Sequence, residues 1–325
     1  MAQQIKHWVL NVSKFLKFKL EILKQIQLAP HSWGFLFVGG WVDFLMNKNC
    51  IITGATDGLG KQTALDLAKL GYNIGLVGRN QEKGDAVLDE IASATGNHSL
   101  KYFQADLSNI RNLDNLANDI KREYDSIDIL INNAGAYFSQ YIETEEQFEM
   151  TFALNHLSYF QLTMLLIDVI EFEIPGRVIN VASSAHFGAK LDLNDIQLKK
   201  RYKGWTAYSN SKLMNILFTY EVHKRYKDTG ISFNSLHPGF VDTSFGDNNK
   251  GIGKNILSIG KKLIAINVIK GARTNFYLAS SNEVENVSGK FFEKSKPVQS
   301  SKVSYSDTNQ HKLWSYSQNI INNLY

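Results

Sequence analysis

The chain has 325 residues, of which 44% are hydrophobic and 20% are charged, values typical of a soluble globular protein and sufficient for one α/β domain with extensions. The single cysteine, Cys50, excludes a disulfide within the chain, and its apolar surroundings predict a buried, inert thiol. The formal charge of +4 arises in residues 1–30, which hold five lysines against one glutamate. The rest of the chain is formally neutral, so nucleic-acid binding is not indicated.

Residues 1–46 are predicted to form a basic amphipathic and aromatic extension. At helical spacing, one face carries the apolar residues Ile5, Val9, Val12, Leu16, Leu20 and Leu23. Another face carries the charged residues Lys14, Lys17, Glu21 and Lys24. The lysines argue against a secretory signal peptide, and Trp33–Met46, with 14 residues including Asp43, is too short to span a bilayer easily. Two readings stay open: the extension packs on the main domain, or it attaches peripherally to a membrane.

From Asn49 onward, apolar runs alternate with amphipathic ones, the pattern of a parallel sheet covered by helices on both faces. The predicted strands are Cys50–Thr53, Asn73–Gly78, Leu100–Gln104, Ile127–Ile131, Arg177–Val181, Ile231–Leu236 and Lys290–Phe292. The predicted helices begin near Leu59, Glu82, Ile110, Glu145, Trp205 and Gly271. A last helix, containing Trp314, Ser317, Ile321 and Leu324, is expected to pack on the domain.

A glycine-rich turn, TGATDGLG, follows the first predicted strand and opens the first predicted helix. Its glycines are Gly54, Gly58 and Gly60, one residue wider than the usual dinucleotide fingerprint. Backbone amides of such a turn and a helix N-terminus together bind a pyrophosphate. The turn therefore indicates a dinucleotide cofactor.

The end of the second strand indicates which nicotinamide cofactor binds. Gly78 occupies the position where an acidic side chain would bind a ribose 2′-hydroxyl, and Arg79 follows it. A guanidinium offers a forked, permanently charged donor to a 2′-phosphate. The pattern favours NADP(H) over NAD(H), although a surface arginine opening a helix would read the same way.

Two further segments follow the third and fourth strands. Asp106 could accept from the adenine amino group or cap a helix before Ile110, and both roles can hold together. The sequence Asn132-Asn133-Ala134-Gly135 would bring backbone close to the adenosine ribose.

The string YSNSK places Tyr208 four residues before Lys212, so the two side chains share one helical face. A free phenol titrates near pH 10, and a neighbouring ammonium would favour the phenolate. We expect Lys212, aided by an oxidised nicotinamide, to lower the pKa of Tyr208 for acid–base work.

The motifs TGATDGLG, NNAG, NVASS, YSNSK and HPG occur in this order, and the chain resembles the short-chain dehydrogenase/reductase family over roughly residues 49–292. It is similar to the retinol-dehydrogenase-like branch through GLGKQTA, LVGRN, SNSKLMNILFT and SGKFFEKSKPV. The resemblance implies a doubly wound, Rossmann-like α/β fold with seven parallel strands. It divides the chain into an N-terminal extension (1–46), a catalytic domain (47–300) and a helical tail (301–325).

The resemblance also implies a catalytic tetrad of Asn155, Ser183, Tyr208 and Lys212, with Ser183 contacting substrate and Ser184 as the second choice. In the family, Lys212 would hydrogen-bond the nicotinamide ribose, Ser183 would donate to the substrate oxygen, and Asn155 would hold a proton-relaying water. The implied cofactor-binding residues are Gly54, Thr56, Asp57, Gly58, Leu59, Gly60, Arg79, Asp106, Leu107, Asn133, Ala134, Gly135, Tyr208, Lys212, Pro238, Val241 and Thr243.

Other expectations concern the substrate and partners. The apolar stretch within residues 240–270 is expected to cap a lipophilic substrate, such as a retinoid, steroid or fatty aldehyde. The segment between Ser183 and Tyr208 is interpreted as a loop over the substrate mouth. His186 could touch substrate or be solvated, and His237 is interpreted as a packing residue. Family analogy implies a homodimer in the cytosol or on the cytosolic face of an endomembrane; the alternative function is a non-catalytic nucleotide sensor or scaffold.

Overall fold

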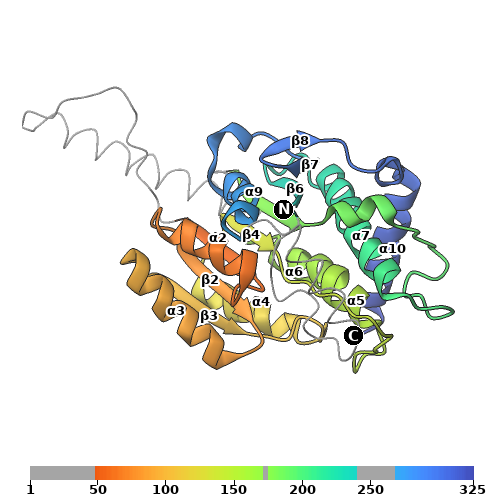
Figure 1. Cartoon of the computed structure of the whole chain (residues 1–325), viewed down its shortest axis with the longest axis horizontal. Helices are drawn as coiled ribbons and strands as arrows, with labels where there is room; N and C mark the ends of the chain where they lie inside the picture. The colour runs from red at the N-terminus through yellow and green to blue at the C-terminus, as the bar shows by residue number, and fades with distance from the viewer. Residues whose placement is uncertain (1–47, 171–174, 240–267) are drawn as a thin grey trace, which may run out of the picture. The chain divides into compact units, whose positions relative to one another are not determined.

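The computed structural model describes residues 48–170, 175–239 and 268–325, and its centre is a single eight-stranded sheet (Figure 1). The strands are β1 (Asn49–Thr53), β2 (Asn73–Gly78), β3 (Leu100–Gln104), β4 (Ile129–Asn132), β5 (Arg177–Val181), β6 (Ser232–His237), β7 (Lys290–Glu293) and β8 (Lys296–Val298). Their order is β3-β2-β1-β4-β5-β6-β7-β8, and every pairing is parallel except that of β7 with β8. The order reverses beside β1, which makes the sheet doubly wound. The predicted fold class is confirmed.

The helices cover both faces of this sheet (Figure 1). They are α2 (Gly58–Ala68), α3 (Gln81–Thr95), α4 (Leu113–Glu123), α5 (Met150–Phe152), α6 (Ser158–Leu166), α7 (Gly204–Arg225), α9 (Val268–Ser280) and α10 (Asp307–Asn322). Successive side chains of a strand point to opposite faces. Accordingly Ile51 belongs to the core under α4, α6, α7 and α10, while Cys50 and Ile52 belong to the core under α2, α3 and α9.

Cys50 lies within the second of these cores. Its side chain is fully buried, and burial raises the pKa of the thiol well above its ordinary range. A thiol that stays protonated is a weak nucleophile. The prediction of a buried, inert cysteine is confirmed.

Three details of the sequence-based prediction are wrong. The sheet has an eighth strand, β8, which follows β7 through a two-residue turn with positive φ at Lys294 and Ser295. The helix expected near Ile110 begins at Leu113. The helix expected near Glu145 begins at Met150, where the Glu149 carboxylate accepts from two backbone N–H groups of the first turn.

The last helix, α10, packs against α6 and α7 through aromatic side chains. The Trp314 ring lies 5.0 Å from the Phe160 ring and 6.1 Å from the Phe218 ring, measured between centroids. The Arg225 guanidinium covers the same indole at 4.4 Å, a cation–π contact. These contacts attach the C-terminal residues to the helix that carries Tyr208 and Lys212.

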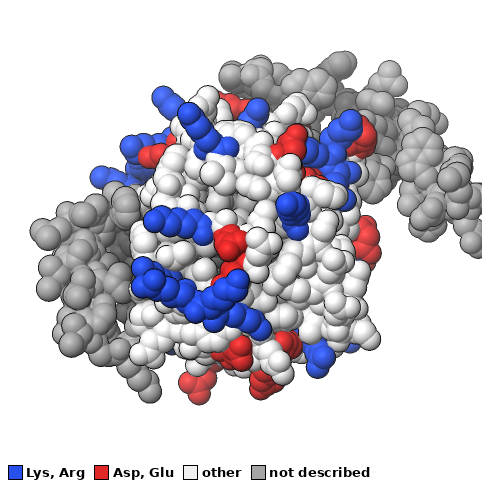
Figure 2. All heavy atoms as spheres, turned by 90° about the vertical axis from the view of Figure 1, so that its right-hand side faces the viewer, with Lys and Arg blue, Asp and Glu red and all other residues white. Residues whose placement is uncertain are grey.

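Figure 2 shows one face of the molecule, on which basic and acidic side chains are interspersed over a largely uncharged surface. Across the described residues no helix is both long and apolar enough to cross a bilayer. The predicted extension, residues 1–46, and most of the predicted substrate cap lie outside the described residues.

Candidate active site

The glycine turn joins β1 to α2 in a conformation that only small residues allow. Gly54 and Gly58 have φ values of +63° and +53°, in the left-handed region. A Cβ on Gly54 would lie 2.8 Å from the Ala134 Cα, and one on Gly60 would lie 2.4 Å from the Gly54 carbonyl oxygen. The turn is therefore tight, because a side chain at Gly54 or Gly60 would collide with neighbouring backbone.

Asp57 is the N-cap of α2. Its carboxylate accepts from the Gly58 N–H at 2.7 Å, which fixes the first turn of the helix. Thr56, the preceding residue, faces the end of β2, because its methyl group would lie 2.9 Å from a Cβ on Gly78. Leu59 is the second residue of the helix, so its N–H is among those without an acceptor in the helix itself.

The NNAG segment is bound to this turn from β4. The Asn133 amide donates to the carbonyl oxygens of Thr53 and Gly54 at 2.8 and 3.2 Å. The Thr53 hydroxyl in turn accepts from the N–H groups of Asn133 and Ala134 at 2.9 and 3.0 Å. The Asn133 side chain thus holds the two loops together.

Sequence reasoning did not single out Thr53, although it directly precedes the first glycine. It also missed Tyr159, whose hydroxyl donates to the Ala134 carbonyl at 2.7 Å. Tyr159 lies four residues after Asn155, and this spacing puts both side chains on one helical face, which could have indicated that Tyr159 is near the site.

At the end of β2, position 78 is sterically restricted to glycine. A Cβ there would lie 2.9 Å from both the Thr56 methyl group and the Tyr102 hydroxyl. Arg79 is exposed at this edge, and its carbonyl oxygen accepts from the Gln104 side chain at 3.1 Å. Among the described residues, its guanidinium takes part in no ion pair, so it is available to an anionic ligand.

Asp106 and Leu107 follow β3. The Asp106 carboxylate accepts from the N–H and the hydroxyl of Ser108, at 2.9 and 2.7 Å, and stays exposed. It does not cap a helix as expected, because α4 begins later and its N-cap is Asn112. Leu107 is buried in the core, so only its backbone could contact a cofactor.

Ser183, Tyr208 and Lys212 meet between the end of β5 and α7. The Ser183 side chain is hydrogen-bonded to the Tyr208 side chain. The Lys212 ammonium lies 5.7 Å from the centre of the Tyr208 ring and donates to the Val181 carbonyl oxygen at 3.0 Å. Lys212 is only 3% exposed, whereas Tyr208 is partly exposed. Of the two adjacent serines, Ser183 is the one bonded to the tyrosine.

Asn155 reaches this cluster from a π-helical turn, Ala153–Leu157, which precedes α6. Its side-chain amide accepts from the Ala136 N–H and donates to the Ala136 carbonyl, both at 2.9 Å. It also donates at 3.1 Å to the Ser211 hydroxyl, which donates to the Tyr208 carbonyl at 2.8 Å. Single π turns occur often at functional sites, where they redirect backbone groups out of the helical ladder.

Gly135 lies between Asn155 and Lys212. A Cβ at this position would be 3.3 Å from the Asn155 Oδ1 and 3.3 Å from the Lys212 Nζ. The absence of a side chain therefore allows the amide and the ammonium to approach the same point. The structure brings all four residues of the predicted tetrad into one contiguous group.

Burial dominates the titration of this group. It lowers the pKa of Lys212 from 10.5 to about 7. It raises the pKa of Tyr208 from 10.0 to about 12, against the hydrogen bond from Ser183, which lowers it. In the chain alone the Tyr208 pKa is therefore raised, because burial outweighs the Ser183 hydrogen bond. The expectation that Lys212 and an oxidised nicotinamide together lower this pKa stays a prediction.

The segment between Ser183 and Tyr208 is pinned at several points. Asn210 exchanges two hydrogen bonds with the Lys190 backbone, at 2.8 and 3.3 Å. Gln197 accepts from the Glu149 N–H at 2.9 Å, and Ile196 is buried. This part of the segment packs on the domain, and its predicted place over a substrate stays a prediction.

Both histidines considered in the sequence are buried. His186 is 1% exposed, so it is neither solvated nor available to a substrate, and both readings of it are wrong. His237 ends β6 at 5% exposure, which confirms it as a packing residue. Pro238 follows directly and leads out of the sheet, while Val241 and Thr243 lie outside the described residues.

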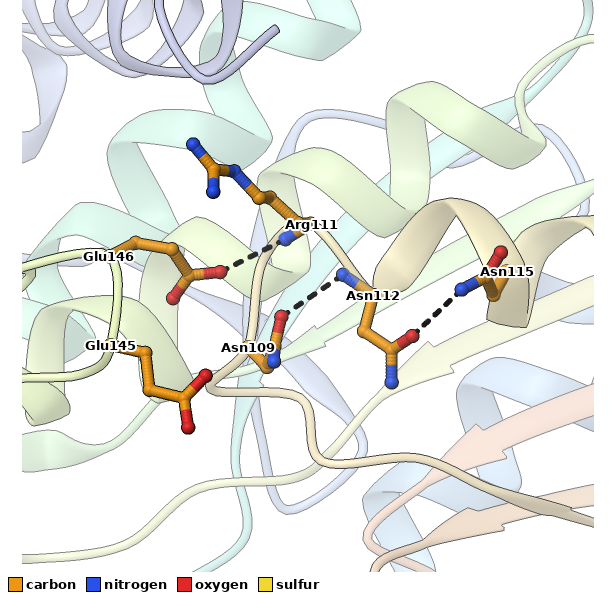
Figure 3. Close-up of a pocket in the computed structure, with 6 residues that line it drawn as sticks. All are labelled: Asn109, Arg111, Asn112, Asn115, Glu145 and Glu146. Atoms are coloured by element: carbon orange, nitrogen blue, oxygen red, sulfur yellow. Dashed lines mark hydrogen bonds between the residues drawn. The ribbon is translucent and has the colours of Figure 1, made fainter.

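A surface hollow of about 380 Å³ lies between the start of α4 and the loop before α5 (Figure 3). Its lining is polar throughout: Asn109, Arg111, Asn112, Asn115, Glu145 and Glu146. The Glu146 carboxylate accepts from the Arg111 N–H at 3.1 Å. None of these residues belongs to the predicted site, and no group suited to a metal ion occurs among the described residues.

Comparison with known proteins points to one family. A family model described as short chain dehydrogenase matches residues 48–251. Retinol dehydrogenase 13 of Homo sapiens is 36% identical over 279 residues, which cover 84% of this chain and 84% of that protein. Retinol dehydrogenase 12 of Homo sapiens is 34% identical over 280 residues, covering 85% and 87%.

Solved structures agree on the fold. A putative uncharacterized protein from Mycobacterium paratuberculosis has a TM-score of 0.68 at 27% identity, covering 84% of this chain and 92% of that one. A short chain dehydrogenase from Burkholderia cenocepacia J2315, solved in complex with NADP, has a TM-score of 0.59 at 20% identity, covering 76% and 95%.

Proposed function

Because the chain belongs to the short-chain dehydrogenase/reductase family, in its retinol-dehydrogenase-like branch, we propose that it is an NADP(H)-dependent oxidoreductase. It interconverts a lipophilic carbonyl compound and its alcohol. The observation that carries this proposal is the contiguous group of Ser183, Tyr208, Lys212 and Asn155, together with a tight glycine turn at the N-terminus of α2.

The residues of the glycine turn fit a dinucleotide. Positive φ at Gly54 and Gly58, and the close approach at Gly60, leave backbone N–H groups at the start of α2, where an anion is favoured. The exposed guanidinium of Arg79 suits the additional 2′-phosphate of NADP(H). The exposed carboxylate of Asp106, which follows β3, is proposed to accept from the adenine amino group.

The tetrad residues would act on the carbonyl group as follows. When bound, NADPH supplies the hydride that reaches the carbonyl carbon. Tyr208 donates its proton to the carbonyl oxygen, and its raised pKa keeps the phenol in the protonated, donating form at neutral pH. Ser183 donates a hydrogen bond to the same oxygen as negative charge develops. Lys212, with a pKa of about 7, exchanges protons readily and reprotonates Tyr208 through water held near Asn155.

The substrate class rests on the relatives. The two retinol dehydrogenases reported above carry the name of a long apolar alcohol, and a retinoid, steroid or fatty aldehyde fits that class. A lipophilic substrate would be met at a membrane surface, so residues 1–46 are proposed to contact the cytosolic face of an endomembrane. By family analogy the protein is a homodimer.

The rival function is a nucleotide-sensing or scaffold protein without turnover. Tyr208→Phe separates the two, because it removes one hydroxyl and leaves the ring in place. The enzyme hypothesis predicts that the wild type consumes NADPH with an apolar aldehyde or ketone, and that the variant binds NADPH with unchanged affinity but reduces nothing measurable. Equal turnover by both proteins, or turnover by neither with any carbonyl offered, would contradict it.

A further inference from the structure

His186 is held by hydrogen bonds on both ring nitrogens, one of them to the backbone of Ser183. Its Nδ1 lies 2.6 Å from the Ser183 carbonyl oxygen, and its Nε2 lies 3.1 Å from the Ser301 backbone nitrogen. The imidazole packs edge-on against the Phe291 ring, at 4.9 Å between centroids. The ring therefore connects the start of the loop after β5 with a segment 115 residues further along the chain.

These partners determine which nitrogen carries the proton. A carbonyl oxygen can only accept, so Nδ1 must donate to Ser183. A backbone N–H can only donate, so Nε2 must present its lone pair to Ser301. Both conditions are met only by the neutral Nδ1–H tautomer. Burial, which lowers the pKa of His186 against the opposing effect of the Ser183 carbonyl, favours the same neutral form.

The segment that holds Nε2 is itself attached to α7. The Ser300 hydroxyl is hydrogen-bonded to the Tyr220 hydroxyl at 2.7 Å and to the Ser304 hydroxyl at 2.6 Å. The Tyr305 ring stacks on the Tyr220 ring at 5.4 Å, and its hydroxyl accepts from the Ser300 N–H at 3.1 Å. Helix α7 also carries Tyr208 and Lys212. These contacts therefore connect Ser183, through His186 and residues 300–305, to the helix that carries the tyrosine and lysine of the site.

We propose that His186 is a positioning residue, which fixes the Ser183 backbone so that the Ser183 hydroxyl stays bonded to Tyr208. This inference rests on the proposed function for its kinetic part, since it assigns His186 to the same reaction. Without the imidazole, the Ser183 carbonyl keeps only the hydrogen bond from the His186 backbone N–H at 3.2 Å, and the contact that ties it to the C-terminal segment is lost. The Ser183 hydroxyl would then spend less time at the position where it contacts the substrate oxygen.

Three substitutions separate the two hydrogen bonds of the imidazole. His186→Asn places an amide N–H near the Nδ1 position and keeps the donation to Ser183. His186→Gln places amide atoms near the Nε2 position and keeps only the contact with Ser301. His186→Phe keeps the ring and loses both bonds. We expect kcat to fall about tenfold in the Phe and Gln variants and less than about threefold in the Asn variant, with NADPH affinity unchanged.

The matched control is His223→Phe. His223 is half-buried on α7 and its Nδ1 lies 2.8 Å from the Ser288 hydroxyl, but it has no hydrogen bond to Ser183 among the described contacts. Its substitution should lower the melting temperature and leave kcat per folded molecule unchanged. If His186→Phe behaves like this control, or if His186→Asn loses as much kcat as His186→Phe, the positioning role is refuted.

A second readout does not depend on turnover. In protein labelled with 13C at the tyrosine Cζ, the Tyr208 resonance is the one that Tyr208→Phe removes. Its chemical shift reports the hydrogen bond to Ser183, so it should move in His186→Phe and stay in His223→Phe. A shift that stays put in both variants would overturn the inference. If the Tyr208 resonance moves in His186→Phe but the wild type reduces no carbonyl compound, the proposed function is rejected and the positioning role stands.

Discussion

Replacing Lys212 by methionine should change the stability of the fold in a pH-dependent way. Burial lowers the Lys212 pKa from 10.5 to about 7, so the unfolded chain binds this proton more tightly than the folded chain. Unfolding is therefore favoured by protonation, and the free energy of unfolding rises with pH between the two pKa values. Below pH 7 the lysine is protonated in both states, and the full cost of burying the ammonium is present.

The magnitude follows from the size of the shift. Each pKa unit corresponds to about 1.4 kcal/mol, so the 3.5 units between 10.5 and about 7 amount to roughly 5 kcal/mol at pH 6. Between pH 6 and pH 9 about 3 kcal/mol of this cost disappears. The lost hydrogen bond to the Val181 carbonyl, worth about 1 kcal/mol, opposes the gain at every pH. We expect Lys212→Met to be the more stable protein at pH 6, with an advantage that shrinks by about 3 kcal/mol by pH 9.

Urea unfolding of the wild type and Lys212→Met at pH 6, 7, 8 and 9 measures this difference. Lys227→Met is the matched control, because Lys227 is exposed and its substitution removes no buried charge. The expected result is a stability gap that changes with pH for Lys212→Met and stays constant for the control. A gap of constant size for Lys212→Met would show that burial does not govern this ammonium, and would refute the reasoning.

Three further predictions concern the cofactor, the site and the N-terminal extension. Arg79→Ala should raise the KM for NADPH about tenfold or more and leave that for NADH nearly unchanged, and equal effects on both would contradict the assigned phosphate contact. Gly135→Ala puts a methyl group 3.3 Å from the Lys212 amine and should lower kcat. The control Gly188→Ala has no atom within 4 Å of its added Cβ and should leave kcat unchanged. Similar kinetics for both variants would show that the site tolerates the methyl group. Deletion of residues 1–46 should release the protein from membranes in cell fractionation without lowering its specific activity, and an unchanged distribution would exclude a membrane role for them.

Much of the sheet could be predicted because buried parallel strands are nearly continuous apolar runs. Asn73–Gly78, Leu100–Gln104 and Arg177–Val181 were predicted with the bounds that the structure has. The edge strand Lys296–Val298 was missed because it has only three residues, includes a proline, and follows a turn without glycine. The late start of α5 depends on the Glu149 carboxylate, whose capping role shows only when the helix direction is known.

The site divides in the same way. Residues within one motif, such as Tyr208 and Lys212, could be paired from their spacing alone, since a helix brings positions four apart together. The role of His186 could not be predicted, because its partner Ser301 lies 115 residues away. The residues around His186 in the sequence do not indicate a contact at that separation. The contribution of burial to the Tyr208 pKa could not be predicted either, because it depends on the tertiary packing around the phenol.

The most direct test of the central claim is the transfer of deuterium from NADPH labelled at the nicotinamide C4 to an apolar aldehyde, followed by mass spectrometry of the product. The account predicts that the purified wild type transfers deuterium to one prochiral face of the aldehyde, which gives an alcohol with one deuterium on the carbinol carbon. Tyr208→Phe should give no labelled alcohol. An alcohol without label, or labelled alcohol formed equally well by Tyr208→Phe, would contradict hydride transfer assisted by this tyrosine.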